Sequence, residues 1–180
     1  MKENVQKYYG ETLNSTQDLQ TNACCTDSGL PGFVKPLLAQ VHDEVLTRYY
    51  GCGLVLPELL DGLTILDLGC GAGRDVYVLA QLVGEQGQVI GVDMTDDMLE
   101  VANRNAPIIG EAIGYCNVEF RKGRIQDLAL DLTVLEEHLA ANPITDANSW
   151  MALTAIEQEI RENHTLVDDE SIDVVVSNCV

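Results

Sequence analysis

Residues 65–75 read ILDLGCGAGRD, and this stretch indicates the fold of the chain. An apolar strand leads into Gly69, Gly71 and Gly73, and a helical pattern of apolar residues begins at Arg74. Glycines suit such a turn because the backbone takes unusual angles there and a ligand approaches the main chain closely. A strand, a glycine-rich turn and a helix in this order predict a nucleotide-binding corner in an α/β sheet.

Two residues of this corner narrow the choice of ligand. Arg74 stands where the dinucleotide fingerprint has its third glycine, so the pattern for binding a pyrophosphate is blocked. Asp67 lies two residues before the first glycine. A carboxylate at this place attracts an ammonium group and repels a pyrophosphate. The corner therefore favours the methionine end of S-adenosylmethionine as its ligand.

Residues after the next two strands could bind the rest of that cofactor. Asp93 closes the second strand 24 residues after Gly69, where a carboxylate can accept both ribose hydroxyls. Met94 offers a soft apolar surface to the adenine face. Ile125 and Gln126, after the third strand, could supply apolar contact and hydrogen bonds to the adenine edge. The alternative is that Asp67 and Asp93 only cap turns.

Short apolar stretches and helical patterns alternate along the chain. The expected strands cover 64–68, 88–92, 117–121 and 172–177. The expected helices cover 31–50, 74–83 and 95–105, the last with Thr95 as its N-cap. This alternation predicts a doubly wound, Rossmann-like α/β sheet, and the apolar fourth strand is typical of a buried parallel strand. Since the chain stops at Val180, directly after that strand, we expect a truncated sheet.

We expect an N-terminal helical segment over 1–62 and a cofactor-binding domain over 63–180. Residues 127–165 interrupt the alternation and form an insertion of two amphipathic helices. One helix face carries Leu132, Leu135 and Leu139, and the other carries Trp150, Leu153, Ile156 and Ile160. The insertion either packs over a sheet edge or acts as a substrate lid.

The charge balance excludes several classes of partner. The chain has 29 acidic and 10 basic residues, for a net charge of −19. Such a surface repels phosphate backbones and anionic membranes, so we expect neither nucleic acid nor membrane as a partner. No apolar signal core follows Met1 and no apolar run is long enough to span a bilayer. We expect a cytoplasmic monomer that acts on a small molecule.

The six cysteines need an explanation because cytosolic thiols are normally reduced. No Cys-x-x-Cys pair exists, so a structural zinc site is not indicated. Cys179 follows the fourth strand, at the sheet edge where α/β folds bind ligands. By itself it is either a ligand or a buried core thiol. Cys70 fits the glycine turn as a small residue, and Cys116 lies in a loop.

Beyond the glycine corner, the chain resembles the arsenite methyltransferase family of class I methyltransferases. The resemblance rests on four blocks outside the insertion: YYG at 8–10, LQTNAC at 19–24, residues 41–57 with RYYGCGL at 48–54, and residues 173–180 with SNCV at 177–180. It implies transfer of a methyl group from S-adenosylmethionine to thiolate-bound As(III), for detoxification of arsenite or its thiol conjugates. Thiolates are soft ligands that suit the soft arsenic atom.

The resemblance also implies roles for particular residues. Cys52 and Cys179 would bind As(III), and Cys24 would form a catalytic disulfide with Cys52 that thioredoxin or glutathione reduces. Tyr50, Gly51 and Asn178 would border the cofactor. The family has a further arsenic-binding cysteine after the fourth strand, so we expect the chain up to Val180 to be inactive alone. Cys25 beside Cys24 is not a fixed feature of the family.

Two other functions remain open at this point. Another small-molecule methyltransferase, acting on oxygen, nitrogen or carbon, would need a general base or a shaped apolar pocket. A non-catalytic binder of thiophilic ions would use the cysteines but would not need Asp67 and Asp93.

Overall fold

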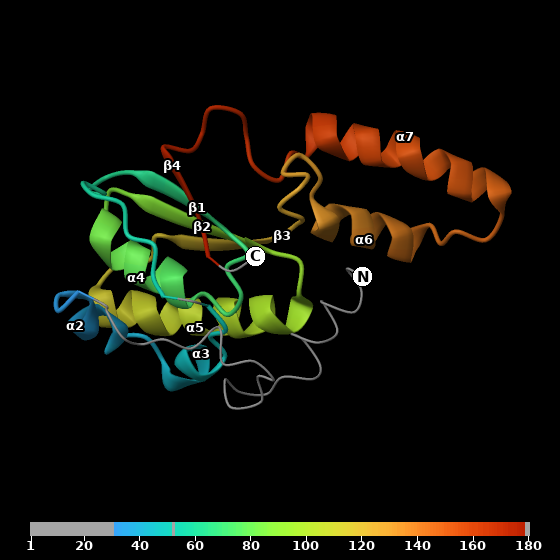
Figure 1. The fold of residues 1–180 in the computed structure, drawn as a ribbon. Coiled ribbons are helices and arrows are strands. Elements are labelled where there is room, and N and C mark those ends of the chain that lie inside the picture. Colours follow the sequence, from blue (N-terminus) through green and yellow to red (C-terminus); the bar gives the residue numbers. More distant parts are fainter. Residues whose placement is uncertain (1–30, 52, 179–180) are drawn as a thin grey trace.

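The computed structural model describes residues 31–51 and 53–178 (Figure 1). Within them, four strands form one parallel sheet in the order β3-β2-β1-β4. The strands are β1 (Thr64–Leu68), β2 (Gln88–Asp93), β3 (Val118–Lys122) and β4 (Val174–Ser177). Each lies within two residues of its expected place, and the parallel sheet with its helices confirms the α/β, Rossmann-like fold class.

The strand order places the functional edge of the sheet. The chain turns from β1 outward to β2 and β3, and then returns to the other side of β1 with β4. Leu68 at the end of β1 is in register with Val92 of β2 and Ser177 of β4. Ligands of open α/β sheets bind beyond the carboxyl ends of the strands, where the order reverses. Here that point lies between β1 and β4.

Helices α4 (Arg74–Val83) and α5 (Asp96–Ile113) cover one face of the sheet (Figure 1). The expected range of α4 is confirmed, whereas α5 continues eight residues beyond Asn105 and passes through Pro107. A proline inside a helix removes one backbone hydrogen bond. The additional turns bury Ile109, which is 3% exposed, and this burial offsets the missing bond.

The expected helix over 31–50 is wrong in one respect, because the structure has two short helices there. They are α2 (Val34–Leu38) and α3 (Asp43–Thr47). His42 takes an extended backbone conformation between them, and its Nδ1 accepts from the Glu44 amide at 3.3 Å. This side-chain cap starts α3 anew. Both helices still contribute to the core, where buried valines from them pack against α4 and α5.

The insertion forms an antiparallel helical hairpin that projects from the sheet (Figure 1). Its helices are α6 (Leu132–Ala141) and α7 (Ala147–Asn163), so two helices are confirmed. Asp131 caps α6, and a capping box starts α7. Trp150 does not share the buried face of α7, because it lies in the first turn beside the outer connection and is 65% exposed.

Strand β4 differs from the expected fully buried strand. Among the described residues it pairs with β1 alone and forms an edge of the sheet. Val176 is 5% exposed and Val175 is 56% exposed, which is the alternation of a strand with one covered face. Within residues 31–51 and 53–178, no helix combines the length and the apolarity needed to cross a bilayer.

Candidate cofactor and substrate site

The glycine turn after β1 has the backbone that the sequence predicts. Gly69, Gly71 and Gly73 all have positive φ, at 76°, 54° and 88°. The amide of Gly69 donates to the carbonyl of Val92 at 2.8 Å, which holds the turn against the end of β2. A Cβ on Gly73 would lie 2.8 Å from the ring of Phe120, so glycine is required here for space as well as for φ.

Asp67 is a buried acid at the base of this turn. It is 3% exposed, and no hydrogen-bond donor within 31–51 and 53–178 reaches its carboxyl group. Burial, and then the charges of Asp75 and Asp93, raise the pKa of Asp67 from 3.8 to about 7. A bound cation would favour the ionised form and lower this pKa again. The site thus has a carboxyl group suited to an ammonium ligand.

Asp93 ends β2 and joins it to the glycine turn. Its Oδ2 accepts from the Gly71 amide at 2.9 Å, and its Oδ1 accepts from the Thr95 amide at 2.8 Å. These bonds are the capping role that the sequence left open. A carboxylate has about four acceptor positions, so two remain for ribose hydroxyls. Capping and cofactor binding are therefore compatible at Asp93.

The residues expected near adenine follow β2 and β3 at the same edge. Met94 comes directly after Asp93 and is half-buried. The amide of Gly123 donates to the Asp93 carbonyl at 2.9 Å, which places the loop after β3 beside the end of β2. In that loop Ile125 is half-buried and Gln126 is exposed.

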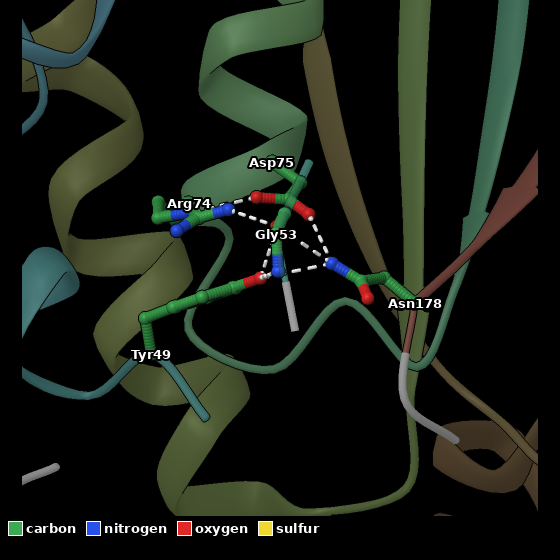
Figure 2. Close-up of polar contacts among 5 residues, drawn as sticks. All are labelled: Tyr49, Gly53, Arg74, Asp75 and Asn178. Carbon is green, nitrogen blue, oxygen red and sulfur yellow. Dashed lines mark hydrogen bonds and ion pairs between the residues drawn. The ribbon is translucent and has the colours of Figure 1, made fainter. Parts of the chain in front are cut away.

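A cluster of polar contacts, which we call the Arg74 clamp, joins three distant segments (Figure 2). Its members are Tyr49, Gly53, Arg74, Asp75 and Asn178. Arg74 Nε donates to Asp75 Oδ1 at 2.7 Å, and its Nη2 donates to the Gly53 carbonyl at 2.5 Å. The guanidinium carbon lies 3.1 Å from the centroid of the Tyr49 ring. The start of α4 thereby holds the loop that leads from α3 to the sheet.

Asn178 brings the end of β4 into the clamp. Its side-chain amide donates to the Tyr49 hydroxyl and to the Gly53 carbonyl, both at 2.8 Å, and to Asp75 Oδ2 at 3.2 Å. The Tyr49 hydroxyl donates to the Gly53 carbonyl and accepts from the Gly53 amide. Residues 49–53, the start of α4 and the end of β4 therefore meet next to the glycine turn.

Burial sets the electrostatics of the clamp. Asp75 is 8% exposed, and burial raises its pKa in spite of the opposing effects of Arg74 and Asn178. Burial, and then the charge of Asp75, also raise the pKa of Tyr49. Tyr49 therefore stays a neutral phenol that can donate and accept hydrogen bonds. A Cβ on Gly51 would lie 2.1 Å from the Tyr49 hydroxyl oxygen, so this loop needs glycine there.

The structure brings most of the expected cofactor residues to one edge of the sheet. They are Asp67, Gly69, Gly71, Gly73, Asp93, Met94, Ile125 and Gln126. Tyr50 and Gly51 belong to the loop held by the Arg74 clamp, and Asn178 is a member of it. Cys24, Cys52 and Cys179 lie outside the described residues. Gly51 and Gly53 flank position 52 in the chain, and Asn178 precedes position 179.

Among the described residues, the surroundings of Cys70 and Cys116 give neither cysteine a catalytic role. Cys70 is buried, and burial together with Asp93 and Asp67 raises the pKa of its thiol. It packs against Gly91, where a Cβ would lie 2.8 Å from its sulfur. Cys116 is exposed.

The sequence did not indicate the clamp. From the sequence, Arg74 only argues against the dinucleotide pattern, and no role follows for Asp75 or Tyr49. Two adjacent charged residues at the start of an otherwise apolar helix were the available signal, because ionised groups are rarely buried unless they are paired.

Comparison with known proteins identifies the class of protein to which the chain belongs. A family model described as "Methyltransferase domain" matches residues 59–151, which contain β1, the glycine turn and Asp93. The chain belongs to this methyltransferase family. Within it, the chain is similar to the arsenite methyltransferases.

Two curated relatives and one solved structure carry this similarity. The arsenite methyltransferase of Aquipseudomonas alcaligenes is 59% identical over 129 residues, which are 72% of this chain and 37% of the relative. The human arsenite methyltransferase is 49% identical over 131 residues, 71% of this chain and 35% of the relative. The crystal structure of an arsenic(III) S-adenosylmethionine methyltransferase from Chlamydomonas reinhardtii has a TM-score of 0.58 at 36% identity, and covers 84% of this chain and 40% of that one. The chain thus spans little more than a third of the length of the curated relatives.

Proposed function

We propose that this chain is the cofactor-binding part of an arsenite methyltransferase, which transfers a methyl group from S-adenosylmethionine to thiolate-bound As(III). The observation that carries the proposal is the Arg74 clamp. It joins the loop that contains position 52 to the end of β4, just before position 179, beside the glycine turn. The names of the similar proteins support the same activity. In this proposal residues 63–180 bind the cofactor, and residues 1–62 bring Cys24 and Cys52 to it.

The residues of the corner fit S-adenosylmethionine. The buried Asp67 carboxyl has no donor among the described residues and suits the ammonium of the methionine part. Asp93 keeps acceptor positions for the ribose hydroxyls. Met94 follows Asp93 in the chain, and the loop with Ile125 and Gln126 is held to the Asp93 carbonyl through Gly123, so we assign these three residues to the adenine. When bound, S-adenosylmethionine supplies an electrophilic methyl group.

The remaining task for the protein is to position the arsenic substrate. We infer that the thiolates of Cys52 and Cys179 hold As(III), since soft thiolates bind a soft ion well. Gly53 and Asn178, the chain neighbours of these two cysteines, are joined by a hydrogen bond of 2.8 Å. The arsenic lone pair is itself the nucleophile, so no general base is required. Alignment of two reactants can lower the activation free energy by up to about 7–11 kcal/mol.

The electron balance gives Cys24 its proposed role. When arsenic uses its lone pair for a new bond to the methyl carbon, the bond from this carbon to the sulfonium sulfur would break and S-adenosylhomocysteine would leave with the bonding electrons. The oxidation state of arsenic would thereby rise from three to five. Two thiols can return the two electrons and become a disulfide, and we assign this step to Cys24 and Cys52. Thioredoxin or glutathione would then reduce the disulfide, as is usual for a transient cytosolic disulfide.

The same proposal includes the setting of the protein. We propose a cytoplasmic monomer that acts on arsenite or its thiol conjugates. The net charge of −19 argues against nucleic acid and anionic membranes as partners.

Replacing Cys179 by serine tests the proposed function in the natural full-length protein. We expect Cys179→Ser to abolish arsenite-dependent release of S-adenosylhomocysteine, measured with and without arsenite. Cys116→Ser is the matched control, because Cys116 is exposed, and its activity should equal that of the wild type. Arsenite-dependent turnover that survives in Cys179→Ser would contradict the ligand role. Turnover that does not depend on arsenite would point to another substrate.

The redox role of Cys24 has a separate test. Cys24→Ser should slow turnover supported by thioredoxin more strongly than it weakens arsenite binding, measured by equilibrium dialysis. An equal loss of turnover and arsenite binding would show that Cys24 is a ligand and not a redox partner.

A further inference from the structure

The α6–α7 hairpin is attached to the carboxyl edge of the sheet by two ion pairs. Lys122, the last residue of β3, pairs with Glu136 of α6, and Asp127 pairs with Arg161 of α7. These two pairs stand on either side of residues 123–126, the loop that follows β3. The hairpin therefore holds this loop at both of its ends.

The first attachment involves a lysine with little exposure to solvent. The side chain of Lys122 is 12% exposed, and its Nζ lies 2.6 Å from both carboxylate oxygens of Glu136. The same nitrogen lies 2.5 Å from Asp96 at the start of α5. Lys122 thus joins β3, α5 and the hairpin at one point beside the end of β2.

The second attachment fixes the turn at the other end of the loop. Nε and Nη2 of Arg161 both donate to Asp127 Oδ2, at 3.1 and 2.9 Å. The Asp127 amide donates to the Arg124 carbonyl at 2.9 Å, which closes the turn. Glu157, one turn earlier on α7, lies 3.5 Å from Arg161 Nη2 and helps to orient the guanidinium group.

Apolar packing supports the same arrangement. The segment after α7 runs back over the sheet, where the Val167 amide donates to the Leu128 carbonyl at 3.0 Å. Leu166 is 2% exposed and packs directly on Gly123, where an added Cβ would lie 2.1 Å from its Cδ2. The loop is therefore enclosed on one side by the chain that leaves the hairpin.

We infer that Glu136 and Arg161 are positioning residues, through which the hairpin fixes residues 123–126 as a wall for the adenosine part of the cofactor. The inference rests on the proposed binding of S-adenosylmethionine. The hairpin acts as a fixed support, in contrast to a lid that opens and closes. Arg161 acts through Asp127 and Glu136 through Lys122, so neither needs to touch the cofactor.

Neutralising the charge of Arg161 or of Glu136 tests this role. In Arg161→Gln and Glu136→Gln, the affinity for S-adenosylmethionine measured by calorimetry should fall about threefold, the size expected for a partly exposed ion pair. Arg161→Lys keeps the positive charge and should recover most of the affinity. Arg104→Gln is the matched control, because Arg104 forms a similar pair between α3 and α5, away from the loop, and its affinity should be unchanged.

Hydrogen–deuterium exchange supplies a second measurement that does not depend on the cofactor. The amides of Gly123 and Asp127 should exchange faster in Arg161→Gln than in the wild type, whereas those of β1 should not change. Unchanged affinity and unchanged loop exchange in both glutamine variants would overturn the inference and leave the proposed function intact. A wild-type protein that binds no S-adenosylmethionine would overturn the proposed cofactor and the inference together.

Discussion

The side-chain amide of Asn178 donates to the carbonyl oxygen of Gly53 over 2.8 Å, and so joins two residues that are 125 positions apart in the chain. The bond connects the end of β4, which pairs with β1, to a loop that precedes the sheet. It passes directly beside Asp75 and Tyr49, to which the same amide also donates. Contacts between distant segments, and not local sequence, therefore determine the structure of this corner of the site.

Replacing Asn178 tests that connection. Asn178→Ala should lower the free energy of unfolding by about 0.5–1.5 kcal/mol, because the Gly53 carbonyl and Asp75 lose a donor. Asn178→Asp should be more harmful, since it puts a second carboxylate next to Asp75. Urea denaturation measures both effects. Asn142→Ala, which removes an exposed amide just after α6, is the control and should change little. Equal stability of all three variants would contradict the proposed importance of the Arg74 clamp.

Loss of the Arg74 charge should be among the most destabilising changes in the chain. Arg74→Met leaves the buried Asp75 carboxylate without its cation, which typically costs about 3–5 kcal/mol. The loss should shrink as the pH falls, because protonation neutralises Asp75. The double variant Arg74→Met/Asp75→Asn should recover part of the stability at neutral pH. Urea denaturation at two pH values checks this, and a double variant no more stable than Arg74→Met would contradict it.

Asp67 should make the protein less stable as the pH rises. Its pKa is about 7 in the folded protein and 3.8 without the fold, so the folded state holds a proton between these values that the unfolded state has lost. The contribution of this group to stability is therefore largest below about pH 4 and is lost as the pH rises through about 7. Asp67→Asn should raise the melting temperature at pH 8 more than at pH 5.

The same substitution should weaken cofactor binding, because a neutral amide does not attract an ammonium group. Calorimetry with S-adenosylmethionine measures this loss. For the wild type, affinity should increase as the pH rises through about 7, since binding requires the ionised carboxylate. A variant that is more stable and binds equally well would show that Asp67 has no part in the site.

Asp93 combines two roles that one pair of measurements can separate. Asp93→Ala removes the acceptors for the Gly71 and Thr95 amides, so the free energy of unfolding should fall. Because the ribose hydroxyls would lose a charged acceptor as well, the free energy of binding S-adenosylmethionine should weaken by about 1.5–3 kcal/mol. Lower stability with unchanged affinity would mean that Asp93 is a turn residue only.

Gly73 of the glycine turn can be compared with Gly114, the residue that ends α5, because the two glycines have nearly equal φ. Gly73 and Gly114 have φ of 88° and 90°, but only the Cβ of Gly73 would meet another side chain, the Phe120 ring. Gly114→Ala should cost about 1–2 kcal/mol for its left-handed backbone. Gly73→Ala should cost about 1–3 kcal/mol more for overpacking. Denaturation of both variants checks this, and equal losses would show that the turn relaxes around the added methyl group.

The elements that follow from local spacing were predictable from the sequence. The ranges of β1 and α4 agree with the expectation, because an apolar strand, three glycines and an amphipathic helix follow one another without interruption. The break between α2 and α3 was not predictable, since apolar residues keep their helical spacing across it. It depends on the side chain of His42 capping a new helix.

The candidate site likewise has a part that the sequence predicts and a part that it does not. Asp67 and Asp93 lie next to strand ends that the sequence identifies, so their meeting at one sheet edge could be expected. The partners of Arg74 could not, because Asn178 lies 103 positions from Asp75 and meets it only once β4 pairs with β1. The length of α5 likewise depends on the tertiary burial of Ile109, which outweighs the local effect of Pro107.

The burial of Cys70 keeps this thiol away from reagents in solution, which matters for the arsenite methyltransferase that we propose. A thiol held in its protonated form against Gly91 is a poor nucleophile, so alkylating agents such as iodoacetamide should leave Cys70 unmodified while they label Cys116. Toxic metalloids would be equally slow to react with it. The fold can thus keep a sulfur atom inside the glycine turn without creating a thiol that would compete for the proposed arsenic substrate.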